Sequence, residues 1–227
     1  MTVVLIALNC AVYFFLQDGL LGLPRDGLGG EWNVPQYAAI PCEITGQGPC
    51  QTSPDAIPDA ATVFTAMFMH GSLLHLGGNM LFLWIFGNNI EDSMAPVRYV
   101  LFYLLGGIAA FAAQAAVDPS SPVPTVGASG AVAAVLGGYL LQFPRARVVT
   151  VIFIVFFFTI FELPALLVLG FWFVQQVLFG YFDFVDPTRE GGGVAYFAHI
   201  GGFVLGLLLI RLFATRTKPV PPRYPVY

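Results

Sequence analysis

Three short groups of polar residues interrupt sequence that is otherwise apolar. The first contains His70, His75 and Asn79, the second contains Ser129, and the third contains His199. All three histidines of the chain belong to these groups. A serine hydroxyl beside an imidazole forms a nucleophile with its general base. The groups therefore indicate acyl-transfer chemistry, provided that the fold brings them together.

Ser129 lies in a Gly-Ala-Ser-Gly sequence directly after a proline-rich stretch, which places it near a helix N-terminus. Backbone N–H groups are unsatisfied there and can hold an oxyanion. Small residues at Ser129, Ala133 and Gly137 recur every four positions, so the same sequence also fits a helix-packing face. The two interpretations are compatible, because close packing would bring a base to the serine.

Gly202 and Gly206 follow His199 on one helical face and predict a close approach to the helix of Ser129. Ionisable residues inside membrane helices commonly mark functional sites. The segments that carry the three groups contain no Asp or Glu, and Glu162 is expected near the opposite membrane face. We therefore expect a Ser129–His199 dyad rather than a triad.

His75 and Asn79 are four residues apart and should project from one helical face as donors to an oxyanion. Gly127 is expected to support the site, and His70 to fix the preceding loop by hydrogen bonding. The alternative is a metal site of His75, Asn79 and His199 with His70 nearby. No carboxylate or cysteine at matching depth completes the ligand set, so we predict neither a metal nor a cofactor.

The elements that must position these residues are membrane helices. Hydrophobic residues make up 57% of the 227 residues and charged residues 10%, against about 25% charged in soluble domains. The mean hydropathy is +0.79. The net charge of −4 offers no basic surface to nucleic acid. A spanning helix needs about 20 residues. The sequence predicts an all-α, polytopic bundle of six such helices at 2–21, 73–90, 97–117, 126–143, 163–182 and 194–213.

The loop charges orient this bundle. With a cytoplasmic N-terminus, only Arg25 and Arg189 of the nine basic residues fall in outer loops. This asymmetry follows the positive-inside rule and also places the C-terminus in the cytoplasm. The second, fourth and sixth segments then enter from the outer side. His75, Ser129 and His199 should therefore lie at similar depth in one site.

Residues 1–215 are predicted to form a single membrane domain, and residues 216–227 a short disordered tail. The outer loop at about 22–65 is either a flexible connector or a substrate-handling or membrane-dipping segment. Its Cys42 and Cys50 can close a disulfide ring in an oxidising compartment, whereas Cys10 is expected only to pack within the first segment. Residues 148–161 are very apolar but too few to span a membrane, because Pro164 interrupts the segment. We expect an interfacial or re-entrant piece there.

The three groups together resemble the signature motifs of the rhomboid intramembrane serine proteases. The motifs are His70-x4-His75-x3-Asn79, Gly127-Ala128-Ser129-Gly130 and Ala198-His199-x-Gly201-Gly202. The resemblance extends from the first to the sixth segment, as a bacterial-type six-helix core. It implies that Ser129 is the nucleophile, that His199 is the base, and that His75 and Asn79 line an oxyanion hole. It further implies cleavage of transmembrane proteins, without metal or cofactor, in a bacterial cell membrane with the site opening outward.

Two other functions fit parts of the sequence. A proteolytically inactive, rhomboid-like factor for binding or quality control of membrane proteins would keep the bundle and dispense with the dyad. A small transporter or channel would use the buried histidines as a proton relay. The sequence contains no series of intramembrane carboxylates and no evident inverted repeat. We therefore favour the protease.

Overall fold

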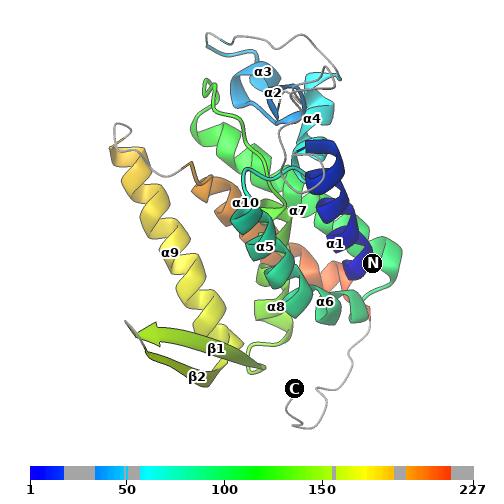
Figure 1. The fold of residues 1–227 in the computed structure, drawn as a ribbon, viewed down its shortest axis with the longest axis vertical. Helices are drawn as coiled ribbons and strands as arrows, with labels where there is room; N and C mark the ends of the chain where they lie inside the picture. The colour runs from blue at the N-terminus through cyan, green and yellow to red at the C-terminus, as the bar shows by residue number, and fades with distance from the viewer. Residues whose placement is uncertain (18–33, 49, 51–56, 155–156, 187–192, 216–227) are drawn as a thin grey trace.

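The computed structural model describes residues 1–17, 34–48, 50, 57–154, 157–186 and 193–215. A bundle forms around five helices: α1 (Thr2–Ala11), α5 (Leu73–Phe82), α7 (Pro96–Val117), α8 (Ser129–Gln142) and α10 (Tyr196–Phe213). Helix α9 (Ala165–Val185) lies along one side of this bundle (Figure 1). The predicted tail at 216–227 and the last four residues of the first predicted segment fall outside the described residues.

Helix α8 occupies the centre of the bundle. All ten residues from Gly130 to Tyr139 are buried, and six of these ten are glycine or alanine. Small side chains allow neighbouring helices to approach the backbone closely. Helices α7 and α10 pack against α8 more extensively than any other helices do. The start of α8, with Ser129, is thereby held between two neighbours.

The glycines of α10 make the closest of these approaches. A Cβ atom at Gly202 would collide with the carbonyl oxygen of Gly130, and one at Gly206 would collide with that of Ala134. From the other side, a Cβ atom at Gly137 would collide with the Phe203 carbonyl. The glycine stripe predicted after His199 therefore does face α8. The contact fixes the height of His199 relative to Ser129.

Two helices are extended by π-helical turns. Helix α1 continues through Val12–Gln17. Helix α5 continues through Leu83–Gly87 into α6 (Asn88–Asp92), so that one helical segment covers the predicted second span. The N–H group of Thr2 donates to the Glu91 carboxylate at 2.7 Å. This bond ties the start of α1 to the end of α6.

Residues 147–154 and 157–164 form two paired β-strands, called the hairpin below, so the prediction of an all-α chain is wrong here. Strand β1 (Arg147–Ile154) pairs antiparallel with β2 (Phe157–Pro164), from Arg147 opposite Pro164 to Ile154 opposite Phe157. The strands overlap the piece predicted at 148–161, and its interfacial or re-entrant position stays a prediction. Valine, isoleucine, threonine and phenylalanine dominate it, and such residues favour strands. Because proline cannot donate to the ladder, Pro164 stands at the strand end and α9 begins after it.

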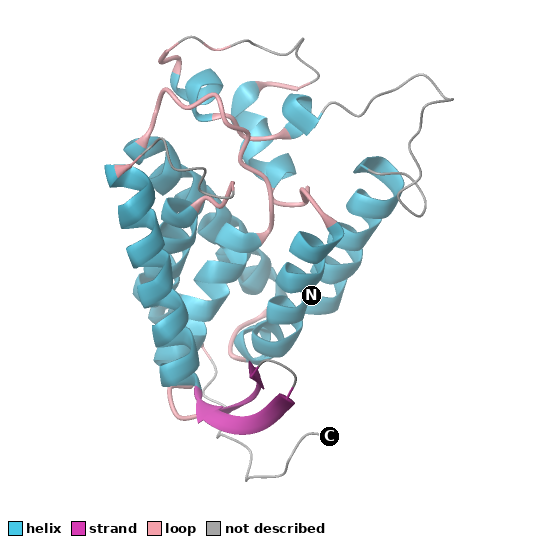
Figure 2. Ribbon diagram, turned by 60° about the vertical axis from the view of Figure 1, so that its left-hand side comes forward, coloured by secondary structure: helices cyan, strands magenta, loops and turns pink. Residues whose placement is uncertain are grey.

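The hairpin and three short helices lie at opposite ends of the molecule (Figures 1 and 2). The short helices α2 (Val34–Tyr37), α3 (Pro41–Thr45) and α4 (Asp59–Ala66) belong to the predicted outer loop. Cys42 and Cys50 form a disulfide in this region. The described part of the loop is thus folded rather than a flexible connector.

Hydrogen bonds attach this loop to the segment between α7 and α8. Ala39 and Thr125 each donate an N–H group to the other's carbonyl, at 3.1 and 2.9 Å. The N–H group of Cys42 donates to the Ser121 carbonyl at 3.1 Å. The hydroxyl of Thr45 donates to the Pro119 carbonyl at 2.6 Å. The loop therefore braces the strip of chain that leads into Ser129.

Three helices of the described chain are long and apolar enough to cross a membrane: α7, α9 and α10. The extended α1 and α8 are apolar but shorter. Large hydrophobic side chains stand exposed along the outer helices, including Leu167 and Phe171 on α9 and Leu208 and Leu212 on α10. Exposed apolar surface on this scale suits contact with lipid rather than water.

The glycine contacts predict a difference between two matched substitutions. Gly206→Ala should lower the free energy of unfolding by about 1–3 kcal/mol, because the added methyl overpacks the α8–α10 contact. Gly170→Ala in α9 places its methyl where nothing lies within 4 Å, so it should be neutral or slightly stabilising. Denaturant titration in detergent micelles measures both. Equal stability of the two variants would contradict the packing described here.

Candidate active site

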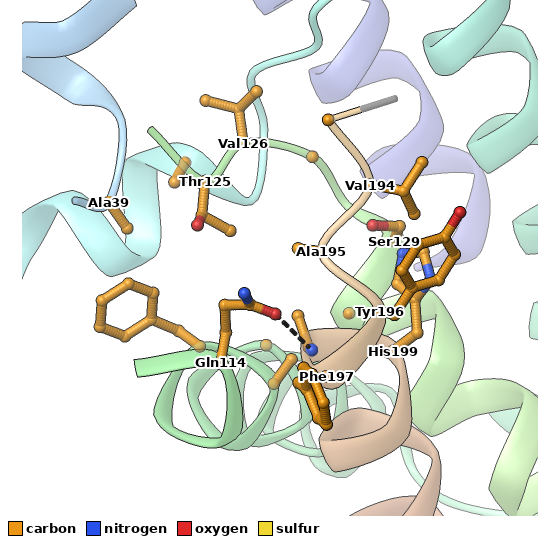
Figure 3. A pocket seen from close by; sticks show the side chains of 18 of the residues that line it. Ala39, Gln114, Thr125, Val126, Ser129, Val194, Ala195, Tyr196, Phe197 and His199 are labelled. Atoms are coloured by element: carbon orange, nitrogen blue, oxygen red, sulfur yellow. Dashed lines mark hydrogen bonds between the residues drawn. The ribbon is translucent and has the colours of Figure 1, made fainter. Parts of the chain in front are cut away.

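A cavity of about 1110 Å³ lies among the first turns of α5, α8 and α10. Side chains of α7, α9 and the docked outer loop complete its walls. Figure 3 shows Ser129 and His199 together at one side of this cavity and Gln114 at the other. His75 and Asn79 line it as well. The three polar groups of the sequence thus share one cavity, which His70 alone of their named residues does not line.

Ser129 is the first residue of α8, where N–H groups have no acceptor within the helix. Two residues earlier, Gly127 adopts φ +124°, which L side chains rarely adopt. Its N–H group donates to the Ala66 carbonyl at 2.8 Å. A Cβ atom there would lie 2.8 Å from the His75 ring. Gly127 therefore anchors the turn and leaves space for that ring.

The close packing of α8 begins one residue after Ser129. Gly130, Ala134 and Gly137 meet the α10 backbone, whereas Ser129 is partly exposed and lines the cavity. The small-residue interpretation of this sequence applies to those neighbours. The hydroxyl of Ser129 remains free of the helix contact and available for chemistry.

Helix α5 presents two donors to the cavity. Its N-cap residue Ser72 accepts a hydrogen bond from the His75 N–H group at 3.1 Å, which fixes the first turn. Asn79 lies one turn further on the same face. Its side chain is 8% exposed, and its Nδ2 atom has no hydrogen-bond partner. A buried amide donor without a partner is costly, so an oxyanion in the cavity would relieve that cost.

The ring of His75 is oriented by its own loop. The Gly71 N–H group approaches Nδ1 of His75 at 3.5 Å, a long hydrogen bond in which this nitrogen accepts. Nε2 then carries the proton in the neutral ring. The ring lies beside Gly127, so this N–H group is placed as a second donor near Ser129.

His199 lies in the first turn of α10, and two side chains of α9 contact its ring. Nδ1 of His199 lies 2.8 Å from Oε1 of Gln176. The rings of His199 and Trp172 pack with centroids 5.8 Å apart and planes inclined by 35°. No hydrogen bond joins Ser129 to His199, although both residues are described and share the cavity. Catalytic hydrogen bonds often tighten only when substrate is bound.

Sequence reasoning missed Gln176, Trp172 and Gln114. The Gln114 side chain of α7 accepts a hydrogen bond from the Ala198 N–H group at 3.2 Å (Figure 3). This bond satisfies a donor at the start of α10, next to His199. One signal could have found both glutamines: each is a polar residue within an apolar span, and such residues commonly have a functional or packing role.

His70 meets its loop mainly through its backbone, and its ring approaches only the Phe68 backbone there. The side chain of His70 is 1% exposed, and neither ring nitrogen has a hydrogen-bond partner in ordinary geometry. The backbone of His70 makes the contact instead, with the Gln17 amide, at 2.9 Å for its N–H group and 2.6 Å for its carbonyl. Burial lowers the pKa of His70 to about 4, with a smaller effect of His75. The ring packs edge-on against His75 and is neutral at physiological pH.

No hydrogen bond or ion pair joins a described carboxylate to His199, although Asp118 and Asp183 line the same cavity. Glu162 belongs to strand β2, at the opposite end of the molecule from the short helices. The group at Nδ1 of His199 is an amide, not a carboxylate. Within the described ranges, no set of three His, Cys, Asp or Glu side chains is arranged to hold a metal ion.

The arrangement combines the parts that acyl transfer needs. It holds a serine hydroxyl at a helix N-terminus, an imidazole with one nitrogen engaged, and two side-chain donors in the same cavity. Hydrolysis of an ester or amide uses these parts as nucleophile, general base and oxyanion donors.

Comparisons with known proteins identify a matching family. Residues 58–216, more than half of the chain, match the family model described as the Rhomboid domain. The chain is 28% identical over 165 residues to Rhomboid protein 1, mitochondrial, of Saccharomyces cerevisiae, which covers 68% of this chain and 42% of that protein. It is 26% identical over 167 residues to RHOMBOID-like protein 5 of Arabidopsis thaliana, which covers 71% of this chain and 49% of that protein.

A shorter match reaches a higher identity. Over 96 residues the chain is 31% identical to the Presenilin-associated rhomboid-like protein, mitochondrial, of Mus musculus. This match covers 40% of the chain and 25% of the mouse protein. The chain thus spans less than half of the length of each of these relatives.

Proposed function

The chain belongs to the rhomboid family of integral membrane proteins, and from this membership we propose that it is an intramembrane serine endopeptidase. One observation carries the proposal. Ser129, His199, His75 and the unpartnered amide of Asn79 line the same cavity, although three different helices contribute them.

Hydrolysis proceeds in two halves. Oγ of Ser129 attacks the carbonyl carbon of the scissile bond, and Nε2 of His199 takes the hydroxyl proton. The oxyanion accepts hydrogen bonds from Asn79, from His75 and from N–H groups at the start of α8. The intermediate collapses as His199 returns the proton to the leaving amine. Water then repeats the sequence on the acyl-enzyme and releases the acid.

The cavity supplies what a bilayer lacks. The bilayer core contains no water, so a hydrolytic site inside it needs a polar chamber. Ser72, His75, Asn79 and Ser129 provide polar lining here. The substrates are transmembrane segments of other proteins, and they must unwind locally to expose a carbonyl group. Glycine or proline in the substrate favours this unwinding.

We place the chain in the membrane as six spanning segments: α1 with its π-helical extension, α5 through α6, α7, α8, α9 and α10. The loop charges favour cytoplasmic termini and a site that opens to the outer side. The bacterial cell membrane fits this orientation, and an oxidising outer compartment suits the Cys42–Cys50 disulfide. Two relatives named above are mitochondrial by name, so the compartment is part of the proposal.

Reconstitution tests this function. The chain in liposomes should cut a single-span test substrate within or next to its membrane segment, with fragments identified by mass spectrometry. A chelator should leave the rate unchanged, because no step uses a metal. Intact substrate after prolonged incubation, together with specific binding of that substrate, would favour the inactive binding factor. Loss of cleavage on chelation and its recovery with zinc would favour the metal site.

A further inference from the structure

We propose that Gln176 is a positioning residue that selects the productive tautomer of His199. This inference rests on the proposed function. The buried residues of α9 are Ala165, Leu169, Gln176 and Gly180, which form one stripe along the helix. Gln176 is the only member of this stripe with a polar side chain, and it is 6% exposed. A buried amide in a lipid-facing helix needs partners, and this one finds them beside the base.

The amide of Gln176 is held in one orientation. Its Nε2 atom donates to the carbonyl of Trp172, one turn earlier on α9, at 3.4 Å. Its Oε1 atom therefore points the other way and lies 2.8 Å from Nδ1 of His199. Because Oε1 can only accept, Nδ1 must be the nitrogen that carries the proton.

The tautomer decides whether His199 can act as a base. A neutral imidazole has one protonated nitrogen and one free nitrogen. With the proton on Nδ1, the lone pair of Nε2 is free to take the proton of Ser129. With the proton on Nε2, that nitrogen could only donate to the serine. An acceptor at Nδ1 thus sets the tautomer, which is one of the two tasks of the carboxylate in a triad.

Trp172 supports the same ring from its face. Its ring packs against the His199 imidazole with centroids 5.8 Å apart. Trp172 and Gln176 are four residues apart, so they lie on one side of α9. Rotation of the imidazole would break the hydrogen bond and the ring contact together. One face of α9 therefore sets both the tautomer and the plane of the base.

The test compares three variants of the reconstituted full chain. Gln176→Met keeps the length of the side chain and removes the acceptor. It should lower kcat for cleavage about 10- to 100-fold, by analogy with the loss of an outer hydrogen-bond partner of a metal-binding histidine, with KM little changed. Gln176→Glu restores an acceptor oxygen and should recover most of the rate. Gln175→Met changes a neighbour about 100° around the helix and should be near wild type.

Labelling by a small fluorophosphonate separates positioning from substrate binding. It requires an activated Ser129 but no transmembrane substrate. Gln176→Met should slow labelling by the same factor as cleavage. Normal labelling with slow cleavage would show that Gln176 contacts the substrate, which would overturn the inference.

A spectroscopic measurement reads the tautomer without any substitution at Gln176. Histidine labelled with 15N at Nδ1 should give a protonated signal for His199, assigned by its loss in His199→Ala. An unprotonated Nδ1 in the active enzyme would overturn the inference, and so would equal rates in Gln176→Met and Gln175→Met. If the unmutated chain neither cleaves nor labels, the proposed function fails and the inference falls with it.

Discussion

Replacing Ser129 by alanine should reduce cleavage of a transmembrane substrate to background and abolish labelling by a fluorophosphonate. The substitution removes the attacking oxygen itself. In serine proteases, loss of the nucleophile lowers kcat by about 10⁶-fold. The variant should fold normally, because Ser129 lies outside the close contact between α8 and α10. Fragment analysis and in-gel fluorescence measure the two effects.

Ser121→Ala is the matched control for this substitution. Ser121 lies in the segment before α8 and lines the same cavity. Its hydroxyl makes only a loop contact, accepting from the Val123 N–H group at 3.3 Å. Its loss should leave cleavage and labelling near wild type. Full activity of a folded Ser129→Ala variant would remove the nucleophile from the mechanism.

His199→Ala should be nearly as damaging, because an unassisted serine hydroxyl is a poor nucleophile at neutral pH. Loss of the catalytic histidine alone costs about as much as loss of the serine when the residues act as a unit. The double variant with Ser129→Ala should therefore be no worse than either single variant. Rates of labelling and cleavage in matched liposomes give this comparison.

His70→Phe serves as the histidine control. The phenyl ring keeps the packing against His75, and the change removes only the weak contact of the His70 ring with the Phe68 backbone. This variant should retain most of the activity. A loss of activity as severe as that of His199→Ala would show that the effect is not specific to His199, and it would no longer identify His199 as the base.

The positions of the site residues could be predicted, because several signals coincide on them. His75, Ser129 and His199 lie near the starts of the second, fourth and sixth apolar segments. Successive segments alternate in direction, so these three segments run the same way. Three such residues must then come to the same end of the bundle, and they do share a cavity. The glycines after His199 also predicted the contact between α8 and α10, because only small residues permit the approach that Gly206 makes.

The role of Gln176 could not be read from the sequence. Gln175 and Gln176 are adjacent, and only the packing of α9 against α10 decides which of them is buried. The rotation of a lipid-facing helix is set by its neighbours rather than by its own apolar pattern. The sequence did contain the weaker signal that a polar pair in an apolar span has a use.

The hairpin formed by strands β1 and β2 was missed for a different reason. Its sequence is apolar almost throughout, so it shows neither the period of a strand nor that of a helix. Length argued against a span, but β-branched content was the evidence that should have decided for strands. The consequence for the site is small. The outer loop with helices α2 to α4 walls the cavity, and the hairpin lies at the other end of the molecule from these helices.

Covalent bridging by a peptidyl chloromethyl ketone tests the pairing of Ser129 and His199 most directly. The serine oxygen adds to the ketone carbon, and Nε2 of the histidine displaces chloride from the methylene carbon. Because the hemiketal at Ser129 persists only in the folded enzyme, a crystal structure of the intact inhibited enzyme should show one inhibitor bonded to both Ser129 and His199. His199→Ala should lose the bridge. An inhibited enzyme in which the reagent joins other residues, or modifies His199 without Ser129, would contradict the dyad.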